Sequence, residues 1–282
     1  MRSYMTDPSL QFFGFKHTQY QCVTARGENK KETPLVEEIP FAISINDISY
    51  AVLMATPVNL EQLALGFLVS EGIIKELSDI RDIELTQNNL PFVQEAVMES
   101  SVVANIQISP RLFNRFKHRQ KAHLGASGCG LCGVDSISQA FPSLTKLKPS
   151  NAKNADALRA LKEQLKPLQT LGNKTGALHA ALLLSQDDKP ICCMEDIGRH
   201  NALDKIIGFA LQNKLSLFNH NVLMSSRCSS ELVQKAVRAG LSNLTHLASP
   251  STLAVTLANH YGLRLIHLPK REAPRLFSNF ND

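Results

Sequence analysis

The stretch Ile191–Leu211, with the sequence ICCMEDIGRHNALDKIIGFAL, indicates how the second half of the chain folds. Its first part, Ile191–Met194, is a short apolar run typical of a strand, and Asn201–Leu211 has the spacing of an amphipathic helix. The same pattern recurs, with further strands expected at Leu178–Leu184, Val222–Ser225, Leu244–Ala248 and Leu263–Leu268, and helices at Ser230–Ala239 and Ser251–His260. This alternation predicts an α/β domain in which helices cover a sheet.

The first half of the chain has the signals of a smaller α+β unit. Asn46-Asp47 separates two apolar runs, which predicts a strand–turn–strand hairpin. Asn59 can cap a helix that begins at Leu60, and Gly72 can end it. Further strands are expected at Ile80–Leu85 and Val102–Ile108, and a basic helix at Pro110–Lys121. We therefore expect a weakly ordered segment at 1–33, a small α+β domain at 34–124, a mobile loop at 125–133 and the α/β domain at 134–282.

Composition excludes several classes of protein. Among 282 residues no apolar run reaches the roughly 18 that a membrane helix needs, and the first residues lack the pattern of a secretory signal. We expect a cytoplasmic protein with no membrane partner. The net charge of +5 suits an anionic ligand such as a nucleotide, and equally suits simple solubility. Because the chain has no Trp and no basic block interleaved with aromatic residues, a nucleic-acid partner is not expected.

The segment 125–133, GASGCGLCG, contains the chain's most distinctive cysteines, Cys129 and Cys132. Four glycines in nine residues disfavour a helix or a central strand, because glycine loses the most backbone entropy on folding. The chain has six cysteines in all, but only this pair has a spacing with chemical meaning. We therefore expect a cysteine-bearing loop.

Three chemistries use such a Cys-x-x-Cys pair. A structural zinc site needs four ligands, and no second half-site with the usual spacing accompanies the pair, so no metal is expected. A thioredoxin-like redox pair normally stands at a helix N-terminus, which lowers the pKa of the first thiol. The glycines on both sides of Cys129 and Cys132 give this pair a more flexible backbone than such a helix end. In a sulfur relay, one thiolate takes a persulfide sulfur and the other assists its release. The residues favour the relay and leave the redox reading open.

Three polar segments follow expected strands and precede expected helices, at residues 195–201, 225–230 and 248–252. The carboxyl ends of strands in open α/β sheets, next to helix N-termini, are where anionic ligands bind. Arg199 and Arg227 add donors suited to phosphate. The alternative is that the serines only cap helices and the arginines pair with Glu195 or Asp196. His179 can be a catalytic residue or a core histidine with its hydrogen bonds satisfied, and the sequence favours the core histidine.

Four motifs, in this order, resemble the FdhD family of formate dehydrogenase accessory sulfurtransferases. They are Thr56-Pro57 with LGFLVSEGII at 65–74, CGLCG at 129–133, EDIGRHNALDK at 195–205, and Arg227 with SSELVQK at 229–235. The resemblance runs from about Pro34 to the C-terminus. The chain departs from the family's usual glycines at Ala177 and Ser226, and from its aromatic and basic pattern after Leu268.

The resemblance implies a sulfurtransferase that takes persulfide sulfur from a cysteine desulfurase. It passes that sulfur to the molybdenum bis-molybdopterin guanine dinucleotide cofactor, for formate dehydrogenase. Carried over, Cys129 holds the persulfide and Cys132 assists release. Cofactor-binding residues are then expected at Arg199, Arg227 and the stretch Leu268, Pro269, Lys270, Arg271, Glu272 and Ala273. The resemblance also implies a homodimer and a cytidine deaminase-like, three-layer C-terminal domain.

Two other functions fit parts of the sequence. A cofactor-binding chaperone would bind guanine nucleotide without moving sulfur, as the departures after Leu268 allow. A thiol–disulfide oxidoreductase would use Cys129 and Cys132 to turn over disulfides and would ignore nucleotides.

Overall fold

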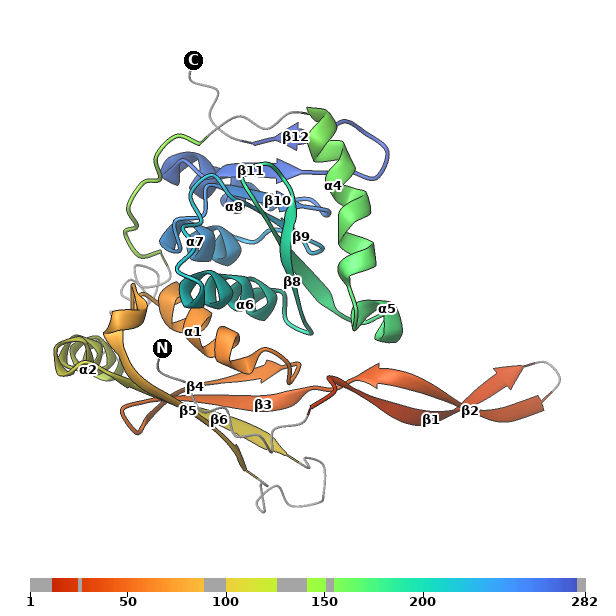
Figure 1. Ribbon diagram of the computed structural model, residues 1–282, viewed down its shortest axis with the longest axis horizontal. Coiled ribbons are helices and arrows are strands. Elements are labelled where there is room, and N and C mark those ends of the chain that lie inside the picture. Colours follow the sequence, from red (N-terminus) through yellow and green to blue (C-terminus); the bar gives the residue numbers. More distant parts are fainter. Residues whose placement is uncertain (1–11, 25–26, 89–99, 126–140, 151–154, 278–282) are drawn as a thin grey trace.

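The computed structural model describes residues 12–24, 27–88, 100–125, 141–150 and 155–277. A small sheet with its helices lies against a larger helix-covered sheet, and a hairpin extends from the side of the small sheet (Figure 1). The first half of the chain builds the small sheet and the second half builds the large one. The expected mixed α/β architecture is therefore confirmed.

The small sheet has the strand order β4-β3-β6-β5. Its elements are β3 (Ile39–Ile45), β4 (Ile48–Ala55), β5 (Ile80–Asn88) and β6 (Ser101–Ile108), with η1 (Leu77–Asp79) before β5 and helix α2 (Pro110–Gly125) after β6. Asn46 and Asp47 join β3 to β4 at φ 47° and 65°, the left-handed values that a two-residue hairpin turn uses. The predicted hairpin and both later strands are confirmed.

Helix α1 (Leu60–Ser70) follows the small sheet's first hairpin. The predicted cap is wrong, because the side chain of Asn59 makes no cap hydrogen bond. Asn59 instead has φ 55°, and its carbonyl accepts the Leu63 N–H at 3.0 Å. Gly72 does end this region, at φ 69°, where a Cβ would be strained.

The expectation of weak order at 1–33 is wrong for most of residues 15–33. Strands β1 (Phe15–Thr24) and β2 (Gly27–Val36) pair antiparallel over ten residues each. Most of their described side chains face solvent, so they lack the apolar alternation by which a half-buried strand is recognised. Backbone pairing rather than burial forms this hairpin, and a side-chain pattern does not report it.

The large sheet has the order β12-β11-β10-β9-β7-β8. Its strands are β7 (His179–Leu184), β8 (Pro190–Asp196), β9 (Asn221–Met224), β10 (Asn243–His246), β11 (Arg264–His267) and β12 (Arg275–Leu276). Strands β9, β10 and β11 are mutually parallel, whereas β7 runs antiparallel to β8 and β9. The five strands predicted in this half are confirmed, and β12 is an addition.

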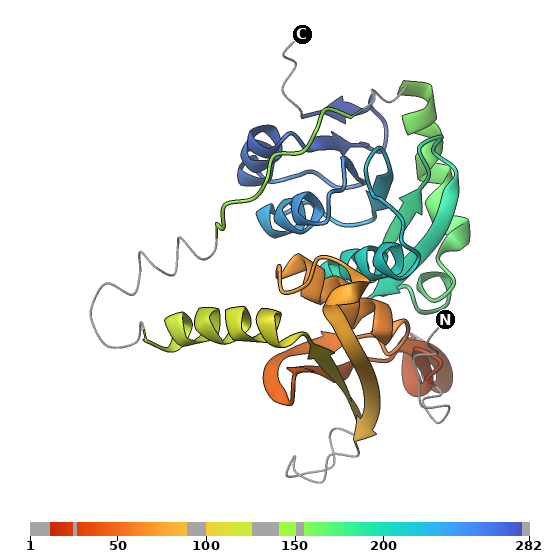
Figure 2. The ribbon, with the colours of Figure 1, turned by 60° about the vertical axis from the view of Figure 1, so that its left-hand side comes forward.

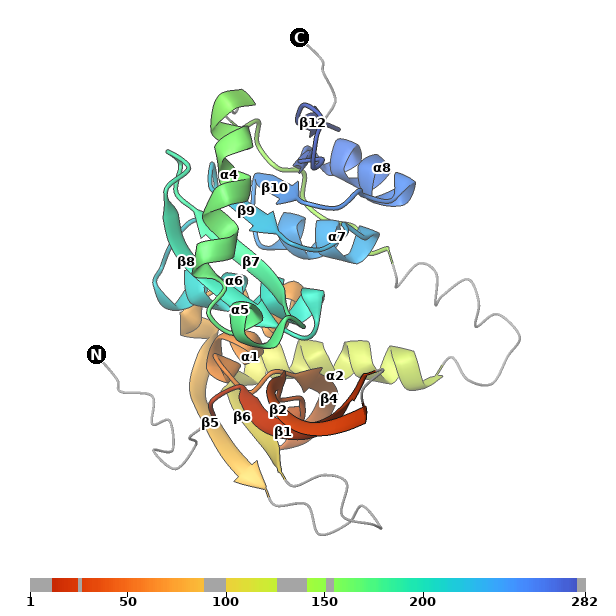
Figure 3. The ribbon, with the colours of Figure 1, turned by 90° about the vertical axis from the view of Figure 1, so that its right-hand side faces the viewer.

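Helices cover both faces of the large sheet (Figure 3). They are α4 (Ala155–Leu168) on one face, α6 (Arg199–Gln212), α7 (Ser230–Arg238) and α8 (Thr252–Tyr261) on the other, and the short α5 (Gly172–Thr175) before β7. Successive residues of β7 serve the two layers in turn: Leu182 packs in the cluster of α4, and Leu183 packs in the cluster of α6 to α8. A strand buried on both faces explains the continuous apolar run at 180–184.

Helices α1 and α6 join the two halves by an unusually close crossing. A Cβ on Gly66 would lie 1.7 Å from the Asp204 carbonyl oxygen, and one on Gly208 would lie 1.9 Å from that of Gln62. Glycine is therefore required at both positions by backbone approach. One cluster of buried side chains runs across this junction from β3 to β11, so the two halves share a core.

Candidate functional site

The carboxyl ends of β8 to β11 meet at one edge of the large sheet. His246, at the end of β10, pairs with Met224 at the end of β9 and with His267 at the end of β11. On the other side of β7, Asp196 at the end of β8 pairs with His179. The three segments predicted to receive an anion follow β8, β9 and β10, so the fold brings them to the same edge.

Basic side chains at this edge are left without partners. Arg199 begins α6, Arg227 follows β9, and Lys270 and Arg271 follow β11. Within the described part of the chain, none of their charged groups forms a hydrogen bond or ion pair, and Arg227, Lys270 and Arg271 are exposed. The alternative that Arg199 and Arg227 pair with Glu195 or Asp196 is therefore wrong for the described contacts.

The stretch after Leu268 is held close to this edge. The Leu268 N–H donates to the His246 carbonyl at 2.9 Å, and Lys162 of α4 donates to the Pro269 carbonyl. Glu272 forms an ion pair with Arg275. Of the predicted 268–273 stretch, Leu268 is buried in the core and residues 270–273 are exposed.

Asp196 lies at the centre of a buried junction between the halves. Its Oδ2 accepts the Thr56 N–H at 3.2 Å, and its Oδ1 accepts the Gly198 N–H at 2.8 Å and the Asn201 amide at 2.9 Å. The Asn201 amide also donates to the Met54 carbonyl at 2.8 Å. Part of the segment predicted to bind an anion therefore holds β4 and the loop after it against α6.

Lys205 completes this junction. Its ammonium lies 2.7 Å from Asp196 Oδ2 and donates to the carbonyls of Thr56 at 3.2 Å and Glu195 at 3.0 Å. Both charged side chains are fully buried. Burial lowers the pKa of Lys205, and the Asp196 carboxylate acts against that lowering. Three acceptors for three N–H groups satisfy the ammonium, which a buried charge requires.

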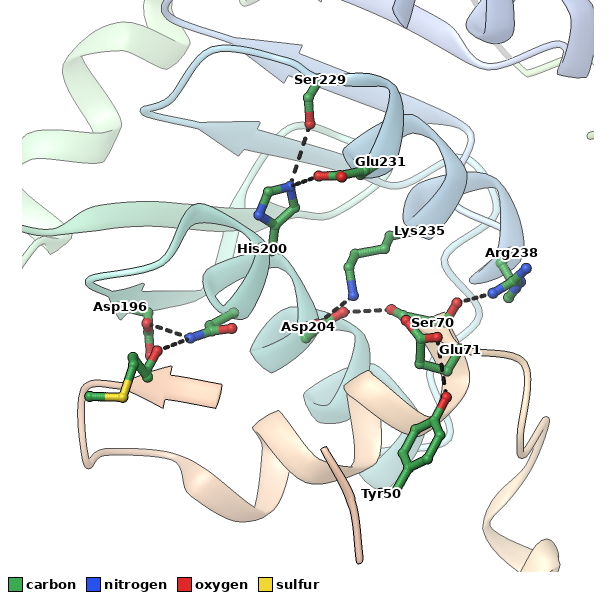
Figure 4. A network of polar contacts seen from close by, with 12 residues as sticks. Tyr50, Ser70, Glu71, Asp196, His200, Asp204, Ser229, Glu231, Lys235 and Arg238 are labelled. Atoms are coloured by element: carbon green, nitrogen blue, oxygen red, sulfur yellow. Dashed lines mark hydrogen bonds and ion pairs between the residues drawn. The ribbon is translucent and has the colours of Figure 1, made fainter. Parts of the chain in front are cut away.

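A second polar network links α6 to α7 and α1 (Figure 4). Asp204 accepts from Lys235 at 2.7 Å and from the Ser70 hydroxyl at 2.5 Å. Nearer the sheet edge, His200 Nε2 lies 2.8 Å from Glu231 and 3.4 Å from the Ser229 hydroxyl. Burial lowers the pKa of His200, while Glu231 opposes the change. These charged side chains therefore position helices and are not free for a ligand.

His179 is a candidate site residue, the less favoured of the two interpretations that the sequence allows. It is half-buried at the sheet edge, and no described residue hydrogen-bonds to its ring, so the expectation of a core histidine is wrong. Burial and then the nearby Arg199 lower its pKa, which favours a neutral imidazole.

His246 is buried behind the same edge. Burial lowers its pKa to about 4, although Nδ1 lies 3.0 Å from the Ser226 carbonyl oxygen. Because the pKa of histidine in the unfolded chain is near 6.5, the neutral ring contributes stability above pH 6.5 that is lost as pH falls toward 4.

Between pH 7 and pH 4, we expect the free energy of unfolding of the wild type to fall by about 3 kcal/mol more than that of His246→Gln, as measured by urea unfolding. The exposed-site variant His17→Gln should keep the wild-type dependence; an identical loss in His246→Gln would contradict the assignment.

Three of the four described cysteines are poor nucleophiles. Burial raises the pKa of the thiols of Cys192, Cys193 and Cys228 to about 12. Cys129 and Cys132 lie outside the described residues, and the loop predicted at 125–133 does so from residue 126 onward. Among the residues that the structure does describe, no three His, Cys, Asp or Glu side chains cluster as a metal site would require.

The fold and this edge define an α/β protein with a basic, solvent-facing sheet edge. The chain belongs to the FdhD/NarQ family, whose model matches residues 36–281. It is 38% identical over 239 residues to the sulfur carrier protein FdhD of Burkholderia mallei, covering 82% of this chain and 83% of that one. The sulfur carrier protein FdhD of Cupriavidus necator is 36% identical over 231 residues, covering 82% and 77%.

The fold also matches a solved structure. The crystal structure of a protein from Desulfotalea psychrophila, assigned as a formate dehydrogenase accessory protein, aligns with a TM-score of 0.69 over 94% of this chain and 97% of that one. At 22% identity this similarity concerns the fold. No helix in the described part of the chain is long and apolar enough to cross a membrane.

Proposed function

We propose that the protein is a sulfur carrier that takes persulfide sulfur from a cysteine desulfurase and delivers it for formate dehydrogenase maturation. The observation that carries the proposal is the glycine-flanked pair Cys129 and Cys132 in a chain of the FdhD/NarQ family. The raised pKa values of the thiols of Cys192, Cys193 and Cys228 support it, because a thiolate is the nucleophile in sulfur transfer.

The chemistry needs two thiolates. The Cys129 thiolate attacks the terminal sulfur of the donor's persulfide, the donor's S–S bond breaks, and its electron pair remains on the donor cysteine. Cys129 then carries the persulfide. The Cys132 thiolate attacks the Cys129 sulfur, which forms a Cys129–Cys132 disulfide and releases hydrosulfide to the acceptor. A dithiol reductant of the thioredoxin class returns the disulfide to two thiols.

The acceptor in this proposal is the molybdenum bis-molybdopterin guanine dinucleotide, bound as a substrate at the basic sheet edge. Arg199, Arg227 and the 268–273 stretch would hold its diphosphate groups, since guanidinium groups suit bidentate phosphate contacts and the Lys270 ammonium adds a positive point charge. Ser226 replaces the family's glycine without strain, because its backbone has no positive φ. Its hydroxyl donates to the Arg227 carbonyl at 3.0 Å.

The cytidine deaminase-like arrangement of the large sheet, a homodimer and a cytoplasmic location are further parts of the proposal. The family resemblance supports each of them. The mixed sheet covered by helices on both faces agrees with the first.

The proposal is tested by incubating the purified protein with a cysteine desulfurase and free cysteine, then measuring intact mass without reductant. A sulfur carrier gains about 32 Da for each sulfur atom it takes up. A protein that gains no mass while it turns over test disulfides would instead be a thiol–disulfide oxidoreductase.

The free arginines at the sheet edge also favour a second candidate, a chaperone that binds the cofactor without moving sulfur.

Under either function, Arg227→Ala should weaken guanosine diphosphate binding at least about tenfold, because a charged hydrogen bond is lost. The control Arg81→Ala changes an exposed arginine on the small sheet and should bind normally. Calorimetry on both variants measures the effect, and an unchanged Kd in Arg227→Ala would remove this edge from nucleotide binding. Binding without sulfur uptake would favour the chaperone.

A further inference from the structure

A groove lies on the opposite side of the α1–α6 junction from the basic sheet edge. It has a volume of about 580 Å³, and most of the residues that line it are apolar. The apolar lining residues include Val69, Ile207, Leu211, Leu215, Leu217 and Phe218. Phe218 is 37% exposed, so it adds accessible apolar surface to the groove.

Three lysines, Lys75, Lys146 and Lys148, line the rim of this groove. All three are exposed, and none of their ammonium groups has a hydrogen-bond or ion-pair partner within the described ranges. No described residue that lines the groove is acidic. An apolar floor with a one-signed rim is complementary to an acidic surface that carries apolar side chains.

The backbone holds these lysines in place. The Leu147 N–H, between Lys146 and Lys148, donates to the Tyr261 carbonyl at 2.8 Å and fixes that segment against the end of α8 (Figure 2). The Lys75 N–H donates to Asp79 Oδ2 at 2.7 Å. The rim is therefore preorganised, although its ammonium groups are free.

The ends of three helices rule against a small phosphate on the floor. The groove is lined at the carboxyl ends of α1, α6 and α7, by Val69, Leu211, and Ala239 with Gly240. A helix carries partial negative charge at its carboxyl end, which disfavours an anion there. The ligand's acidic groups must therefore lie at the rim and its apolar groups on the floor. That division fits a protein segment better than a nucleotide.

We propose that this groove docks an acidic, partly apolar segment of the cysteine desulfurase that supplies the sulfur. This inference rests on the proposed function. Lys146 lies 14 residues after Cys132, so at most about 50 Å of extended chain separates a partner seated here from the cysteine pair. A second copy of this chain is a weaker occupant, because each copy carries a net charge of +5.

The test is the triple variant Lys75→Glu, Lys146→Glu, Lys148→Glu in the full chain. Its Kd for purified cysteine desulfurase should rise at least about tenfold, and the wild-type Kd should rise with ionic strength. The control Lys30→Glu, Lys31→Glu, Lys189→Glu makes the same charge change at exposed lysines elsewhere and should bind like wild type. Sulfur uptake from glutathione persulfide should be unchanged in the triple variant, because a small donor needs no docking groove.

Three outcomes would overturn the proposal. The first is a triple variant that binds the desulfurase like wild type. The second is an equal loss in the control, which would indicate a general charge effect. The third is a triple variant that changes only the dimer fraction in sedimentation, which would assign the groove to a second copy. A wild type that takes up no sulfur from either donor would contradict the proposed function. The Kd measurement would still decide whether the groove docks the desulfurase.

Discussion

Replacing Cys129 by Ala should abolish the 32-Da mass gain from a cysteine desulfurase and reduce sulfur uptake by at least about 100-fold. The reason is that the variant lacks the thiolate that attacks the donor persulfide. The buried thiols of Cys192, Cys193 and Cys228 cannot substitute readily, since burial raises their pKa to about 12. Intact-mass spectrometry without reductant measures the effect.

The matched variants separate the roles of the two cysteines. Cys132→Ala should still gain one sulfur but should release it slowly, because no neighbouring thiolate remains to form the disulfide. Cys22→Ala changes a thiol on the β1–β2 hairpin and should behave like wild type. A Cys129→Ala protein that restored formate dehydrogenase activity in cells would sink the sulfur-carrier proposal.

Replacing Lys205 by Met should lower the free energy of unfolding by about 3–5 kcal/mol, because it leaves a buried carboxylate without its partner. Asp196 is 0% exposed, and the ammonium 2.7 Å away is the only cation that an ion pair gives it among the described residues. The same ammonium donates to the Thr56 carbonyl, so the loss should also loosen the junction between the two halves. Urea unfolding at pH 7 measures the change.

Lys166→Met provides the control on an exposed helix position and should change stability by less than about 0.5 kcal/mol. The double variant Asp196→Asn, Lys205→Met removes both charges and should recover part of the loss. Equal stability of Lys205→Met and wild type would show that the buried pair contributes nothing.

Much of the fold could be predicted from local sequence signals. The alternating runs around Ile191–Leu211 placed the strands and helices of the large sheet, and Asn46-Asp47 placed a hairpin. The β1–β2 hairpin could not be found in this way, because its strands lack a consistently buried face. The predicted side-chain cap at Asn59 is wrong because Asn59 has φ 55° and not the extended backbone of a capping residue. The type of residue does not fix that angle.

The sequence by itself singled out Cys129 and Cys132 as the candidate thiol pair, because such a pair needs only its spacing and its glycines to be recognised. It also placed Arg199 and Arg227 just beyond strand ends. Only the tertiary structure decided what the EDIGRHNALDK string does. Asp196, Asn201 and Lys205 bind the backbone around Met54 and Thr56, about 140 residues earlier in the chain. Partners so distant in sequence meet only through folding, so a local pattern cannot separate a buried junction from a ligand site.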